Sequence, residues 1–139
     1  MTPTSRPDGG RRGLQIAVGT LAAFPFASGL AGMLAGPRSL PGSHGPVSAT
    51  VDSEYRYTHA MYFAAAPVLW ATVPRVERHT TALRAVAGGI FLGGLVRLLS
   101  WRSVGRPHPA IVGAAALEVL GVPALLAWQH RVATLAGDA

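Results

Sequence analysis

The stretch Arg97-Leu-Leu-Ser-Trp-Arg-Ser-Val-Gly-Arg-Pro-His-Pro109 decides how this chain folds. Apolar runs flank it, and its glycine and prolines interrupt helices, so it predicts a hairpin between two helices. Arg97 lies inside the apolar run before the turn, and Glu118 is the one charge in the run that follows, from Ala110 to Gln129. Two opposite charges therefore lie on neighbouring helices close to a shared turn.

The composition is that of a membrane protein. Half of the 139 residues are of the AVILMFWYC types and 13% are charged, about half the charged share of an average soluble protein. All twelve basic residues are arginines, and they stand singly at the ends of apolar runs, so the net charge of +6 does not predict nucleic-acid binding. The absence of cysteine excludes disulfides and thiolate chemistry.

Four apolar runs of near-spanning length predict an all-α integral membrane four-helix bundle. The expected helices are residues 14–35, 55–73, 81–101 and 110–129, within a single transmembrane domain of residues 14–131. A soluble all-α protein with very hydrophobic helices is the disfavoured alternative. Residues 1–13 predict a disordered cytoplasmic tail, and residues 132–139 a short C-terminal tail.

The first run can be interpreted in two ways. Arginines precede it and small residues end it, as in an export signal, but about 22 uncharged residues favour a retained helix. Gly32 and Gly36 form a GxxxG pattern, which indicates a face that admits close helix contact. Gly93, Arg97 and Ser100 share a comparable face of the third run, and Asp52 or Ser53 can cap the second.

Arginine placement predicts the orientation. With four crossings, both termini and the 74–81 link share one side of the membrane. That side has seven arginines outside the apolar runs and the other has three: Arg6, Arg11, Arg12, Arg75, Arg78, Arg84 and Arg131 against Arg38, Arg102 and Arg106. The positive-inside rule then predicts a multi-pass protein of the cell membrane with both termini cytoplasmic.

This topology gathers polar residues in the outer half of the bundle. The candidate cluster consists of Glu54, Arg56, His59, Arg97, Ser100 and Glu118. Helical side chains lean toward the N-terminus of their own helix, so Arg97 and Glu118 lean toward each other in depth. An isolated charge at the centre of a spanning helix costs about 2.5 to 3.5 kcal/mol, so we expect an ion pair.

Structural interpretations of these polar residues stay open beside a ligand-binding one. Arg97 can snorkel to the headgroups, the pair can be only an interhelical clamp, and Glu118 can be protonated. His59 fits an interfacial hydrogen bond, and the tyrosines at 55, 57 and 62 fit an aromatic belt. His108, between two prolines, fits a turn.

The pattern resembles the DUF4345 family, a bacterial family of small four-helix membrane proteins without an assigned function. The resemblance covers residues 52–131 and more weakly the first helix. It rests on Ser53-Glu54-Tyr-Arg56, on Gly93-Gly-Leu-Val-Arg97-Leu-Leu-Ser100 with Gly105-Arg106-Pro107, and on Glu118. Family members often have glycine where this chain has Val96, directly before the arginine. The resemblance implies the four-helix topology and no activity.

The sequence favours a non-enzymatic protein that binds a lipid-like ligand or serves as an accessory subunit of a membrane partner protein. The alternative is a proton-coupled transporter or membrane isomerase in which Glu118 carries the proton, with His59 as the candidate second group. Transport would need a homo-oligomer. We expect no catalytic residue, no metal and no cofactor, because no nucleotide, nucleophile-elbow or metal-ligand motif is present.

Overall fold

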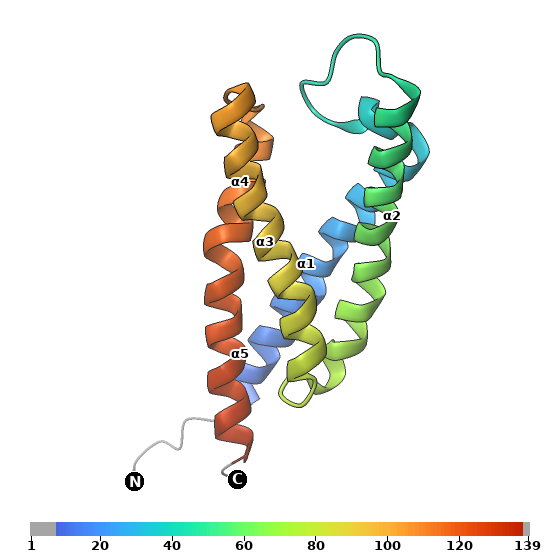
Figure 1. The fold of residues 1–139 in the computed structure, drawn as a ribbon. Helices are drawn as coiled ribbons and strands as arrows, with labels where there is room; N and C mark the ends of the chain where they lie inside the picture. The colour runs from blue at the N-terminus through green and yellow to red at the C-terminus, as the bar shows by residue number, and fades with distance from the viewer. Residues whose placement is uncertain (1–7, 138–139) are drawn as a thin grey trace, which may run out of the picture.

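The computed structural model describes residues 8–137. Within this range the chain is helical and has no strand, and the predicted all-α four-helix architecture is confirmed (Figure 1). The first three helices are α1 (Asp8–Ala35), α2 (Ala49–Thr72) and α3 (Thr80–Val104). The fourth is continuous but has three parts: α4 (Pro109–Ala116), the π-helical turn η3 (Leu117–Gly121) and α5 (Val122–Gly137). Two short 3-10 turns, η1 (Gly36–Ser39) and η2 (Val73–Arg75), follow α1 and α2.

The helices extend beyond the predicted ends of the first and fourth runs. Residues 8–13, expected in a disordered tail, form the first turns of α1, and Arg11 and Gly13 in these turns contact the rest of the chain. The Nε group of Arg11 donates to Oε2 of Glu77 at 3.1 Å, and Gly13 lies against the ring of Trp128. The last helix continues to Gly137, with Val132 buried in the core. The expectations for residues 1–7 and 138–139 lie outside the described residues.

The second helix begins at Ala49, six residues before the predicted start at residue 55. Its N-cap is Ser48, whose Oγ accepts a hydrogen bond from the backbone N–H of Val51 at 3.3 Å. The expectation that Asp52 or Ser53 caps this helix was wrong. Asp52 lies in the first turn of α2, where its carboxylate accepts a hydrogen bond from Nε of Arg56 at 2.7 Å.

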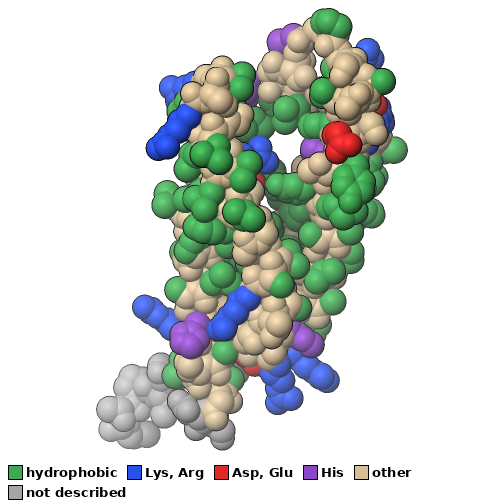
Figure 2. Space-filling model, viewed as in Figure 1, with side chains coloured by type: hydrophobic (Ala, Val, Ile, Leu, Met, Phe, Trp, Pro, Cys, Tyr) green, Lys and Arg blue, Asp and Glu red, His purple; other side chains and the backbone are tan. Residues whose placement is uncertain are grey.

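Three helical segments of the described chain are long and apolar enough to cross a membrane, which is consistent with a membrane protein. They are Gly10–Ser39, Thr80–Val104 and Pro109–Gly137. Hydrophobic side chains cover the length of the bundle, and basic side chains gather at its two ends (Figure 2). The 24 residues of α2 span about 36 Å, enough for a crossing, but its first turns carry acidic and basic residues.

The buried apolar core lies in one half of the bundle, near the beginning of α1 and the end of α5. It consists of Leu14, Val18, Ala22, Leu69, Val76, Leu83 and Val132. From there α1 slants away from α5 and toward α2, so the α1–α2 and α3–α4 pairs separate toward the other end (Figure 1). The space-filling view shows a hollow between the two pairs (Figure 2).

Glycines of α1 make the close packing against α2. A Cβ atom added to Gly29 would stand 2.5 Å from the backbone nitrogen of Phe63, and one added to Gly32 would overlap the ring of His59. The predicted small-residue face of the first helix is therefore used within the chain. Lipid tails are as apolar as these side chains, so close packing of this kind holds membrane helices together.

We expect Gly29→Ala to destabilise the protein by about 1 to 3 kcal/mol, because the new methyl group meets backbone that cannot move aside. The matched control is Gly88→Ala in α3, where an added Cβ meets nothing within 4 Å and alanine gains helix propensity. Thermal unfolding in one mild detergent compares the two variants. Equal midpoints for both would contradict the packing argument.

Candidate functional site

An ion pair joins α3 to the fourth helix in the half of the bundle that contains the turn between α3 and α4. The Nε group of Arg97 donates to Oε2 of Glu118 at 2.9 Å, so the pair that the sequence predicts is present. The Glu118 side chain is 7% exposed and that of Arg97 is 33% exposed. The carboxylate therefore lies inside the protein, and the arginine is the more exposed partner of the pair.

Glu118 lies in the π-helical turn, which sequence reasoning missed. Pro123 has no N–H to donate to the carbonyl four residues earlier, and its ring would crowd that carbonyl in a regular helix. The backbone widens here instead, and the N–H of Val122 bonds the carbonyl of Leu117, five residues back. Pro123 was the available signal, because helix irregularities commonly occur at proline.

Gly94 has no side chain, which lets Glu118 pack closely against the backbone of α3. A Cβ atom at Gly94 would stand 2.8 Å from Cβ of Glu118 and 2.9 Å from Cγ2 of Val119. The sequence pointed to the adjacent Gly93 as the contact position. Gly93 instead faces Tyr62 of α2, whose hydroxyl oxygen would be 3.7 Å from an added Cβ.

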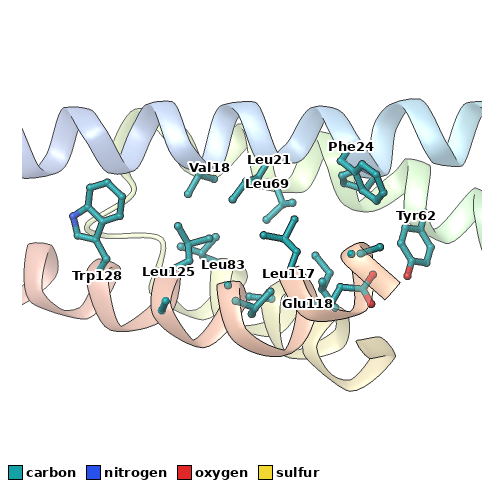
Figure 3. Close-up of a pocket in the computed structure, with 18 of the residues that line it drawn as sticks. Val18, Leu21, Phe24, Tyr62, Leu69, Leu83, Leu117, Glu118, Leu125 and Trp128 are labelled. Carbon is teal, nitrogen blue, oxygen red and sulfur yellow. The ribbon is translucent and has the colours of Figure 1, made fainter. Parts of the chain in front are cut away.

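A cavity of about 470 Å³ lies between α1 and the fourth helix, with α2 and α3 behind it. Such a volume is within the usual range for small-molecule sites. Most of its lining is apolar, and of the described lining residues Glu118 alone carries a charge. Glu118 and Tyr62 lie at one end and Trp128 at the other (Figure 3).

The cavity opens sideways between the helices. Phe24 of α1 is 54% exposed and Leu117 of the fourth helix is 50% exposed, and both line the cavity. Apolar side chains at the rim suit an opening toward lipid rather than toward water. The arrangement can therefore admit an apolar chain whose end reaches Glu118.

Tyr62 is a site residue that the aromatic-belt interpretation missed. Its phenol neighbours the Arg97 guanidinium, and its ring lines the cavity. It continues a column of rings along α2, in which Tyr55 and His59 stack at 3.9 Å and His59 and Tyr62 at 5.9 Å between centroids. The spacing of three and four residues places these rings on one helix face, and that spacing could have identified Tyr62.

The other four candidates lie elsewhere. Arg56 closes the α1–α2 hairpin, because its Nη1 donates to the carbonyls of Met33 and Leu34 at the end of α1 and its Nε to Asp52. The ring of His59 fills the notch at Gly32, with Nδ1 2.8 Å from the carbonyl oxygen of Tyr55. Glu54 and Ser100 are exposed. The structure thus brings together Arg97 and Glu118, with Tyr62 beside them.

The described part of the chain contains no group of three His, Cys, Asp or Glu residues that could hold a metal ion. What the site offers is an apolar enclosure, one buried carboxylate and one phenol. Such a set of groups can bind and orient a molecule through hydrogen bonds.

We expect Arg97→Met to destabilise the protein by about 2 kcal/mol, because it leaves the Glu118 carboxylate buried without a partner. This is less than the cost of breaking a fully buried pair, since a third of Arg97 is exposed. Arg97→Met combined with Glu118→Leu removes both charges and should recover much of the loss. Thermal unfolding measures both, with the exposed Arg102→Met as control. Equal effects of Arg97→Met and Arg102→Met would show that the pair contributes nothing.

The sequence profile described as "Domain of unknown function (DUF4345)" matches residues 13–129. The match covers all of α3 and most of the other three helices, including both members of the ion pair. No curated protein and no solved structure matches the chain. The chain belongs to the DUF4345 family.

Proposed function

We propose that this protein crosses the cell membrane four times, with both termini in the cytoplasm, and binds a lipid-like ligand in the cavity between α1 and the fourth helix. The observation that carries the proposal is the cavity itself, which is apolar along its length and ends at a buried carboxylate. A lipid-like molecule has the same division into an apolar body and a polar end.

Besides the three apolar segments, we assign one more crossing to α2. This helix runs beside α1 along most of its length and is long enough to span (Figure 1). An even number of crossings agrees with the start of α1 and the end of α5 lying at one end of the bundle. The larger group of arginines occupies that end, including Arg11, Arg75 and Arg131, which supports a cytoplasmic location for it.

The site favours binding over acid–base catalysis. An isomerase would need an acid and a base facing one cavity, and Glu118 with His59 was the candidate couple. His59 does not line the cavity and instead packs into the α1–α2 contact. A carrier of protons would still depend on Glu118, so unchanged transport in Glu118→Gln would exclude that alternative.

The remaining alternative is that the protein is an accessory subunit of a membrane partner protein. The molecules that co-purify with it distinguish this alternative from a ligand-binding protein. Native mass spectrometry in mild detergent would show either a small adduct or a second polypeptide. We expect a small adduct on the wild type that is lost when the cavity is filled.

We expect a lipid with a brominated chain to quench the fluorescence of Trp128 in a saturable manner, because Trp128 lines the cavity. Trp128→Phe should remove the saturable component. Trp101→Phe is the control, since Trp101 does not line the cavity and stacks with Arg106. Only non-saturable quenching in the wild type would contradict the proposal.

Filling the cavity provides an independent test. Gly113→Leu should weaken the saturable binding by about tenfold or more, because Gly113 lines the cavity and an added Cβ there meets nothing within 4 Å. Gly88→Leu is the matched control, since its Cβ is equally unobstructed and lies outside the cavity. Equal affinity for both variants would place the ligand elsewhere.

A further inference from the structure

The geometry of Glu118 points to a ligand class, and this inference rests on the proposed function. We infer that the cavity selects uncharged lipids whose polar end is a single hydroxyl group, such as a long-chain or polycyclic alcohol. The hydroxyl donates its proton to Glu118 in a hydrogen bond, and the apolar body lies toward Trp128.

One oxygen of the Glu118 carboxylate is free to accept a hydrogen bond from a ligand. Within residues 8–137, Oε2 of Glu118 accepts from Arg97, whereas Oε1 accepts no hydrogen bond from the protein. The carboxylate points toward the Tyr62 end of the cavity (Figure 3). Oε1 is not fully enclosed by protein atoms, so a ligand in the cavity can reach it. A ligand that brings an O–H or N–H group is stabilised there by a hydrogen bond to a charged acceptor.

The charges around the cavity favour a ligand with an uncharged head. Arg97 already balances Glu118 and does not line the cavity, so the carboxylate is the charged group that a ligand meets. An anionic head would be repelled by that carboxylate, and no cationic side chain lines the described cavity to offset the repulsion. A cationic head would bring a second positive charge into an apolar enclosure whose negative charge is already paired. A neutral donor adds no charge and satisfies the free oxygen.

The small exposed area of Glu118 favours a ligand with a small polar head. The Glu118 side chain is 7% exposed, so little of its surface is open to contact, and a single hydroxyl group fits that small area better than a phosphate or sugar head. Tyr62 lies at the same end and supplies a phenol that can donate to the ligand oxygen. A hydroxyl group both donates and accepts, which matches a carboxylate oxygen beside a phenol. An ether or a ketone only accepts.

The test compares probes of one chain length on the full protein in mild detergent. Hexadecanol, hexadecyl methyl ether, hexadecanoate and hexadecylamine compete for the saturable quenching of Trp128. We expect hexadecanol to bind about tenfold more tightly than its methyl ether, because a hydrogen bond to a charged acceptor is lost in the ether. The acid and the amine should bind more weakly than the alcohol.

The variant that combines Arg97→Met with Glu118→Leu is the control for partition into the micelle. It removes both charges together, so no unpaired charge threatens the fold. We expect it to bind the ether as the wild type does and to lose the preference for the alcohol. A preference that persists in this variant would overturn the assignment to Glu118.

The outcomes separate this inference from the proposed function. Equal binding of alcohol and ether in the wild type would keep the lipid site and overturn its selectivity. Tightest binding by the acid or the amine would also overturn it and would identify a charged head instead. Binding of none of the four probes, with no saturable quenching by the brominated lipid, would overturn both.

Discussion

A carboxylate buried in an apolar bundle has to be paired, and the half of the structure that contains the turn between α3 and α4 is arranged around that need. Arg97 supplies the opposite charge, Gly94 lets Glu118 approach α3, and the π-helical turn carries the glutamate. These three features lie on two helices joined by a short hairpin, so the charge pair also fixes how α3 and the fourth helix face each other. A local electrostatic requirement therefore determines part of the fold.

The two halves of the bundle are held together in different ways. Near the ends of the chain, buried aliphatic side chains such as Leu14 and Leu83 connect all four helices. Toward the other end of the bundle, α1 follows α2 through glycine contacts and so separates from the fourth helix (Figure 1). The separation leaves a cavity whose walls are apolar apart from Glu118 and Tyr62. The cavity is thus a consequence of α1 having two different partners along its length.

The sequence predicts the four helices because long apolar runs leave few other solutions in a membrane. It also predicts the Arg97–Glu118 pair, because two charges with few other partners lean toward one depth. It does not predict the start of α2, since Ser48, Asp52 and Ser53 are all suitable caps. Nor does it place Arg56, whose hydrogen bonds go to the end of another helix. The π-helical turn and Tyr62 depend on packing between helices, which periodicity along a single helix does not specify.

The pairing of Arg97 with Glu118 has a consequence for the membrane potential. A charge that moves across the bilayer exchanges about 2.3 kcal/mol with the potential for every 100 mV. Nε of Arg97 and Oε2 of Glu118 lie 2.9 Å apart, and the pair carries no net charge. Small shifts of the pair as a unit therefore move almost no charge across the bilayer. With an uncharged ligand, loading and emptying the cavity would be electrically silent. Its occupancy would then follow the amount of ligand in the surrounding leaflet and not the energised state of the cell.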